Sequence, residues 1–162
     1  MASKNRIFDP YSRDSNLILI SQVVGQYHLG DYINCFRRGS LVMKLPDSPV
    51  SSIETILFAT ISGSVGVIAS LPKREYEELN QLQDILRQYI KGVGGFDHRF
   101  WRSFDSAFPR PDTESKGFLD GDLLEQILDL NRTELDRISD GLGDEAMAAK
   151  LFHLIEDLSR LH

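Results

Sequence analysis

The feature that most constrains the fold is a change of hydrophobic period at Pro72. Before Pro72, apolar and β-branched residues form short runs separated by turn residues, which is typical of strands. After it, apolar residues recur every three or four positions, as they do along one face of a helix. The chain of 162 residues is therefore predicted to be mixed, with a β part followed by an α part.

Four runs before Pro72 are predicted to be strands: residues 17–24, 40–45, 54–61 and 65–71. The last two flank Ser62-Gly-Ser64, a spacer that favours a hairpin. Four short strands make a sheet with two open edges and an apolar face that needs cover, about the size of one propeller blade. Because we find no second copy of this unit in the sequence, we expect the β part to be incomplete by itself.

The helical part begins with an apolar stripe that Gly92 ends: Tyr76, Leu79, Leu82, Leu86 and Ile90. A short aromatic helix is predicted over residues 98–104, and a loop with two prolines over residues 105–117. Three more helices are expected. Asp120 or Asp122 can cap the first, Thr133 can cap the second, and the last begins near Asp144.

Composition excludes several classes of protein. Hydrophobic residues make up 41% of the chain, too many for a disordered protein, and no apolar run has the roughly 18 residues of a membrane helix. The single cysteine, Cys35, cannot form an internal disulfide and favours a reducing compartment. The net charge is −6: six basic and five acidic residues precede Pro72, and the remaining twelve basic and nineteen acidic residues follow it. This balance argues against general nucleic-acid binding.

Motifs that could carry catalysis or bind a cofactor are better explained as structural features. Gly92-Val-Gly-Gly95 lacks the lysine and hydroxyl residue of a phosphate-binding loop, and the turn around Gly63 lacks the pattern of a nucleophile elbow. Asp120-Gly-Asp122 lacks the ligand order of a calcium loop and is interpreted as helix capping. The four histidines have no zinc spacing. The sequence thus predicts no catalytic residue, no metal ligand and no cofactor, and we expect the protein not to be an enzyme.

One stretch leaves an alternative open. Residues 98–104 interleave aromatic and basic side chains, as in some nucleic-acid-binding surfaces. The simpler interpretation packs Phe100, Trp101 and Phe104 inward and leaves Arg99 and Arg102 solvated. The alternative is a nucleic-acid-binding module of an RNA-processing type that uses Arg37, Arg38, Arg99 and Trp101.

Several motifs resemble one family in the same order along the chain. They are HLGDYINCFRRGSLVM (residues 28–43), FATISGSVGVIASL (58–71), IKGVGG (90–95), FWRSF (100–104), GFLDGDLLE (117–125) and LSRLH (158–162). Together they resemble the C-terminal region of the large subunit of the UV-damaged-DNA-binding protein, in a plant-like version. This family belongs to the superfamily of the cleavage-and-polyadenylation-factor A subunit. The resemblance covers about residues 20–162.

The resemblance implies an architecture. Residues 16–71 would be the closing strands, about one blade, of a β-propeller, and residues 72–162 a C-terminal helical domain. Residues 1–15 do not resemble the family's propeller and are expected to be an N-terminal extension. The family's chains are several times longer, so most propeller strands are expected to lie outside this sequence.

The resemblance also implies a function. The family's members are adaptors in cullin-RING ubiquitin ligases and in UV-damage repair, in the nucleus and also in the cytoplasm. Their substrate receptors, often WD-repeat proteins, insert a helical motif between two propellers. The cullin scaffold docks on a propeller that this chain lacks, and DNA is contacted indirectly through a partner subunit. No membrane partner is implied.

Matched position by position, the receptor-facing residues of this chain would be Tyr32, Asn34, Cys35 and Ile61. An aromatic side chain, an amide and two apolar groups near turns can form part of a surface that binds a helix. The alternative is that Tyr32 and Ile61 are core residues. Tyr32 and Cys35 stand where the family has Phe or Val.

Overall fold

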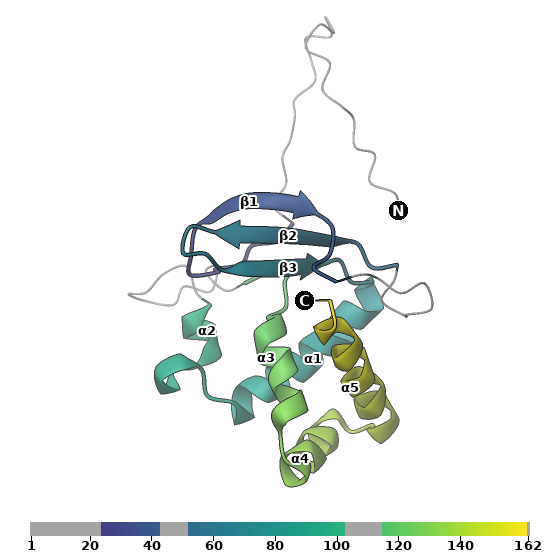
Figure 1. Cartoon of the computed structure of the whole chain (residues 1–162). Helices are drawn as coiled ribbons and strands as arrows, with labels where there is room; N and C mark the ends of the chain where they lie inside the picture. The colour runs from purple at the N-terminus through teal and green to yellow at the C-terminus, as the bar shows by residue number, and fades with distance from the viewer. Residues whose placement is uncertain (1–23, 43–51, 103–114, 162) are drawn as a thin grey trace, which may run out of the picture.

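A computed structural model describes residues 24–42, 52–102 and 115–161 of the chain. In these residues a three-stranded antiparallel sheet precedes a group of helices (Figure 1), as the change of period at Pro72 predicts. The predicted strand at residues 17–24 lies outside the described residues except for Val24. The C-terminal half of the one predicted at residues 40–45 also lies outside them.

The sheet has the order β1-β2-β3, and its strands span Ile33–Arg38, Thr55–Thr60 and Val65–Ala69. The hairpin of β2 and β3 confirms the turn predicted at Ser62-Gly-Ser64, where Gly63 has a φ of 90°. β1 was not predicted. A strand is instead predicted at residues 40–45, and the described residues of that stretch, 40–42, are not in a strand. Arg37 and Arg38 are tolerated because they lie on an edge strand and are exposed.

Apolar side chains occupy both faces of this sheet. Phe36, Phe58 and Gly66 lie in one cross-strand row, and the next row, on the other face, contains Leu57 and Val67. The helices lie beyond β3, at one side of the sheet (Figure 1). Phe36 consequently remains 53% exposed. Because a sheet that faces water on one side alternates apolar and polar residues, this sheet has the pattern of a blade covered on both faces.

The helical part that the structure describes has three long helices and four short helical elements. They are α1 (Lys73–Tyr89), η1 (Val93–Gly95), α2 (His98–Trp101), α3 (Gly121–Glu125), η3 (Gln126–Asp129), α4 (Arg132–Leu142) and α5 (Glu145–Ser159). The predicted helix after Pro72 is confirmed, with Leu79, Leu82 and Leu86 completely buried. These leucines pack with apolar residues of α3, η3, α4 and α5 into one core: Leu123, Leu124, Ile127, Ile138, Leu151 and Ile155.

Two helix starts illustrate how local chemistry sets the boundaries. α4 is capped by Asn131 and not by Thr133: the Asn131 side chain accepts from the backbone N–H of Glu134, and the Glu134 side chain accepts from that of Asn131. This capping box satisfies two helix-end donors at once. The predicted start near Asp144 is confirmed, since its carboxylate accepts from Ala146 and Met147.

The two parts meet in a small apolar contact. Ile53, just before β2, and Leu161, just after α5, are both buried and pack against Ala69, Leu71 and Leu158. The Ser40 hydroxyl also donates to the backbone carbonyl of Leu161. In the described part of the chain, no helix combines the length and the apolar character that crossing a membrane requires.

Candidate interaction surface

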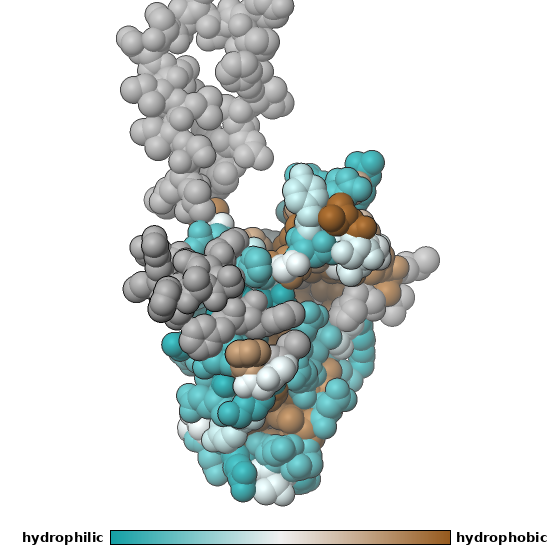
Figure 2. All heavy atoms as spheres, turned by 90° about the vertical axis from the view of Figure 1, so that its left-hand side faces the viewer, coloured by the Kyte–Doolittle hydropathy of each residue, from teal (hydrophilic) through white to brown (hydrophobic). Residues whose placement is uncertain are grey.

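Tyr32 and Ile61 lie side by side at the end of the sheet where β2 turns into β3. The backbone N–H of Ile61 donates to the carbonyl of Tyr32 over 3.0 Å. Their side chains are not core residues here, since Tyr32 is 70% and Ile61 68% exposed. Figure 2 looks onto this end of the sheet and shows apolar atoms at its surface beside hydrophilic ones. We call this pair the Tyr32–Ile61 surface.

Asn34 and Cys35 continue from Tyr32 along β1. The register steps from Ile33 opposite Thr60 to Cys35 opposite Ala59, so Asn34 is the extra residue of a β-bulge. A bulge bends the strand and changes the direction of a side chain. Asn34 is exposed, whereas Cys35 is half-buried. The structure therefore brings the four sequence-predicted residues to one end of the sheet without exposing all of them.

Asp31 holds this end of the sheet together. Its carboxylate accepts from the backbone N–H of Tyr32 over 2.7 Å. Hydrogen bonds from the Thr60 and Ser62 hydroxyls, together with the one from Tyr32, lower the pKa of the Asp31 carboxyl. Asp31 thus links the start of β1 to the end of β2, on either side of the Tyr32–Ile61 surface.

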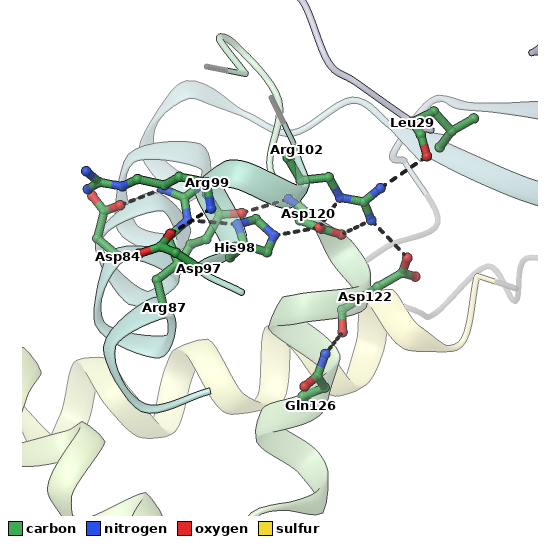
Figure 3. Close-up of polar contacts among 11 residues, drawn as sticks. Leu29, Asp84, Arg87, Asp97, His98, Arg99, Arg102, Asp120, Asp122 and Gln126 are labelled. Atoms are coloured by element: carbon green, nitrogen blue, oxygen red, sulfur yellow. Dashed lines mark hydrogen bonds and ion pairs between the residues drawn. The ribbon is translucent and has the colours of Figure 1, made fainter. Parts of the chain in front are cut away.

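A buried group of charged and polar side chains lies where the helices approach the start of β1 (Figure 3). At its centre, Asp120 accepts from Nε2 of His98 over 2.7 Å and from Nε of Arg102 over 2.6 Å. A second bond, from Arg102 Nη2 over 3.2 Å, makes the ion pair bidentate. All three residues are buried, with at most 7% of any one exposed. We call this group, with Gln83 and Arg87 of α1, the Asp120 cluster.

Two sequence interpretations are wrong at this point. Asp120 stands at the start of α3 but its side chain makes no capping bond, because its oxygens are taken by His98 and Arg102. Arg102 is buried and not solvated. Arg99, in contrast, is exposed as expected. The side chains of Phe100, Trp101 and Phe104 lie outside what the structure describes.

Hydrogen bonds from α1 fix the orientation of the cluster. Gln83 is 2% exposed and its side-chain oxygen accepts from the backbone N–H of Asp120. Arg87 donates from Nε to Nδ1 of His98 over 3.1 Å. Because an arginine N–H can only donate, Nδ1 must be an acceptor, and the His98 proton is on Nε2, where it faces Asp120. Both ring nitrogens are therefore occupied.

Burial and charge act against each other in this cluster. Burial alone would raise the pKa of the Asp120 carboxyl, but the bonds from His98 and Arg102 outweigh it and hold that pKa well below its usual range. Burial would likewise lower the pKa of Arg102, and Asp120 raises it. Burial and then the charge of Asp120 raise the pKa of Tyr27. At neutral pH the cluster contains an ionised pair beside a neutral phenol.

Sequence reasoning did not predict this cluster. His98 and Arg102 are four residues apart and so share a helix face, which is a usable signal. Their partner Asp120 lies 18 residues beyond Arg102, and no periodicity links the two. The sequence around Asp120 suggests only a cap or a calcium ligand, and both uses place the carboxylate toward solvent.

Two other sets of residues are not gathered into a site. Among the residues that the structure describes, no three His, Cys, Asp or Glu side chains are placed to hold a metal ion. Arg37 and Arg38 lie on β1, whereas Arg99 lies on α2. The basic residues of the nucleic-acid alternative are thus divided between two elements.

Comparison with known proteins gives a consistent result. A family model described as the CPSF A subunit region matches residues 11–129. Over 141 residues, 87% of this chain, DNA damage-binding protein 1b of Arabidopsis thaliana is 50% identical. DNA damage-binding protein 1a of the same plant is 48% identical, and DNA damage-binding protein 1 of Solanum lycopersicum is 49% identical, over the same length. The chain spans 13% of the length of each of these relatives.

Proposed function

The chain belongs to the family of the CPSF A subunit region, and from that premise we propose that it is a non-enzymatic adaptor of the DNA damage-binding protein 1 type. Its role would be to hold substrate receptors, often WD-repeat proteins, for a cullin-RING ubiquitin ligase and for repair of UV damage. The cullin would dock on a propeller outside this chain, and DNA would be contacted through a partner subunit. The protein would act in the nucleus and also in the cytoplasm.

The exposed Tyr32–Ile61 surface is the observation that carries this proposal. A helix docks on a surface through a few aromatic and aliphatic side chains that lose their contact with water. Tyr32 and Ile61 are both about two-thirds exposed and are joined through their backbones, so they are available as such anchors. Asn34, exposed at its bulge, supplies a neighbouring amide.

The chemistry of the buried residues also supports a non-enzymatic role. Among the residues that the structure describes, the pair that most resembles a catalytic one is His98 with Asp120, at 2.7 Å. Arg87 occupies the other nitrogen of His98, and only 4% of His98 is exposed. A general base needs a free nitrogen within reach of a substrate. This pair therefore acts as a structural contact.

The experiment measures receptor binding in a chimera in which this chain replaces the matching segment of the Arabidopsis 1b protein. The probe is the helical motif of a WD-repeat receptor. Tyr32→Ala and Ile61→Ala should each weaken binding by about tenfold or more, as for central contacts of an interface. Leu128→Ala is the control, because Leu128 is 45% exposed but lies on η3. If the first two variants bind as tightly as the control, the proposal is wrong.

A second measurement uses the isolated chain. It should bind the same receptor motif much more weakly than the chimera does, because one side of the binding cleft is supplied by another propeller. A gel shift with single-stranded nucleic acid examines the alternative: binding that falls steeply with salt would favour the nucleic-acid-binding module.

A further inference from the structure

We propose that Asp120 and Arg102 are positioning residues for the Tyr32–Ile61 surface. The inference rests on the function proposed above and adds residues to it that lie away from the surface. In outline, the Asp120 cluster fixes the leading segment, residues 24–29, against the helices. The leading segment continues directly into the Tyr32–Ile61 surface, so that its position sets where the surface lies.

The leading segment is bound to the chain just before α3. Gln26 and Lys116 exchange two backbone hydrogen bonds, each 2.8 Å long. At Gly25 a β-carbon would lie 2.9 Å from the Phe118 ring, so the backbone lies directly against that ring. Gly117 has a φ of +68° and faces the carbonyl of Val24 in the same way. The backbone of the leading segment therefore packs closely against residues 116–118, just before α3.

The Asp120 cluster holds the other end of the leading segment. Arg102 donates from Nη1 to the carbonyl of Leu29 over 3.3 Å, and its guanidinium lies 5.0 Å from the centre of the Tyr27 ring. The Tyr27 ring in turn lies 6.0 Å from that of Phe118. Figure 3 shows Arg102 between Asp120 on one side and the Leu29 carbonyl on the other. One guanidinium thus joins the helices to the leading segment.

A bidentate pair of this kind permits one geometry. The guanidinium has a planar fork of donors, and Asp120 accepts two of them. Buried charges that lose their partner are strongly penalised, so the arginine cannot turn away from Asp120 at low cost. Gln83 fixes the backbone of Asp120 from α1. Through Arg102, Asp120 and Gln83, the position of the leading segment is therefore fixed relative to α1.

Only two residues separate the leading segment from the surface. Gly30, with a φ of 84°, makes the turn, and Asp31 is bonded to Tyr32 and to the hydroxyls of Thr60 and Ser62. Each residue of chain spans at most about 3.6 Å. A displacement of Leu29 must therefore move Asp31 and Tyr32 or break their bonds. The Ile61 amide donates to the Tyr32 carbonyl, so its rate of hydrogen exchange reports such a displacement directly.

Amide-resolved hydrogen exchange on the full chain tests the inference. In Tyr27→Leu, which keeps the Asp120–Arg102 ion pair but removes the ring beneath the guanidinium and its hydroxyl bond to Asp120, the amides of Gln26, Lys116 and Ile61 should exchange on the order of tenfold faster or more, while those of Leu151 and Ile155 in the core change about twofold or less. Asp120→Asn should accelerate the same three amides, and those of Leu151 and Ile155 with them, because it also lowers the stability of the helical part.

Asp122→Asn is the matched control, because Asp122 contacts Arg102 only at 3.4 Å and its side chain is 90% exposed; it should change none of these rates. In Tyr27→Leu, faster exchange at Gln26 with no change at Ile61 would overturn the inference, as would equal acceleration in α5, which would mean a general loss of stability. Receptor binding is not part of this readout. Failure of the proposed function in Tyr32→Ala is thus distinguishable from failure of the positioning role.

Discussion

Asp120→Asn should lower the free energy of unfolding of the helical part more than a substitution at an exposed position does. The amide is nearly isosteric with the carboxylate, but its NH₂ group would face either Arg102 or Nε2 of His98, and both are donors. His98 cannot reverse its ring protonation because Arg87 donates to Nδ1. The substitution also leaves Arg102 buried without its counter-charge. Breaking a buried ion pair in this way costs about 3–5 kcal/mol.

Urea unfolding at neutral pH, followed by helical circular dichroism, measures this loss. A loss of about 3 kcal/mol lowers the urea midpoint by about 1–3 M for a slope of about 1–3 kcal/mol/M. The control Asp122→Asn, at an exposed carboxylate, should cost about 1 kcal/mol or less. Equal losses for the two variants would refute the claim that the buried pair determines the effect.

The pH dependence of the unfolding free energy tests independently whether Asp120 is ionised in the folded chain. The pKa of Asp120 is lowered from its usual 3.8 in the folded chain, so its contribution is complete above that value and is lost as the pH falls through and below it. The stability difference between wild type and Asp120→Asn should be constant from about pH 5 to 7 and narrow below about pH 4. A difference that grows with acid would contradict the assigned ionisation.

Other predictions concern the core, a helix cap and the sheet. Leu86→Ala, at a completely buried position, should cost about 2–5 kcal/mol in the same urea assay, whereas Leu128→Ala should cost about 0.5 kcal/mol or less. Asn131→Ala removes the capping box of α4 and should cost about 0.5–2 kcal/mol in thermal unfolding; no loss would mean that water replaces the cap. Gly66→Ala places a methyl group against the Phe58 ring and should speed amide exchange in β3. Adding Phe58→Ala should restore protection there, and failure to do so would contradict this packing.

The helices could be predicted because their signals are local. The stripe from Tyr76 to Ile90 predicts α1, since residues three and four apart on a helix share a face. β1 was missed because Asn34, Arg37 and Arg38 are polar, and only its pairing with β2 makes it a strand. Thr133 was predicted as the cap of α4, but the helix is capped by Asn131 through a reciprocal pair of hydrogen bonds with Glu134. The sequence pattern alone permits either residue as the cap.

The candidate surface could be predicted only in part. Tyr32 and Ile61 were identified through the family resemblance, and nothing in their own sequence pattern distinguishes a surface residue from a core one. Their adjacency depends on the register of β1 against β2. The Asp120 cluster was missed because its members come from α1, α2 and the start of α3, and contacts across such distances follow from packing rather than from periodicity.

Site-specific photocrosslinking tests the central claim, that the Tyr32–Ile61 surface binds a receptor helix, most directly. A photoreactive residue is placed at position 61 in the chimera with the Arabidopsis 1b protein, and at position 128 as the exposed control on η3. We expect a crosslink to the receptor's helical motif from position 61 and none from position 128. Equal crosslinking from both positions, or crosslinking from position 128 alone, would contradict it.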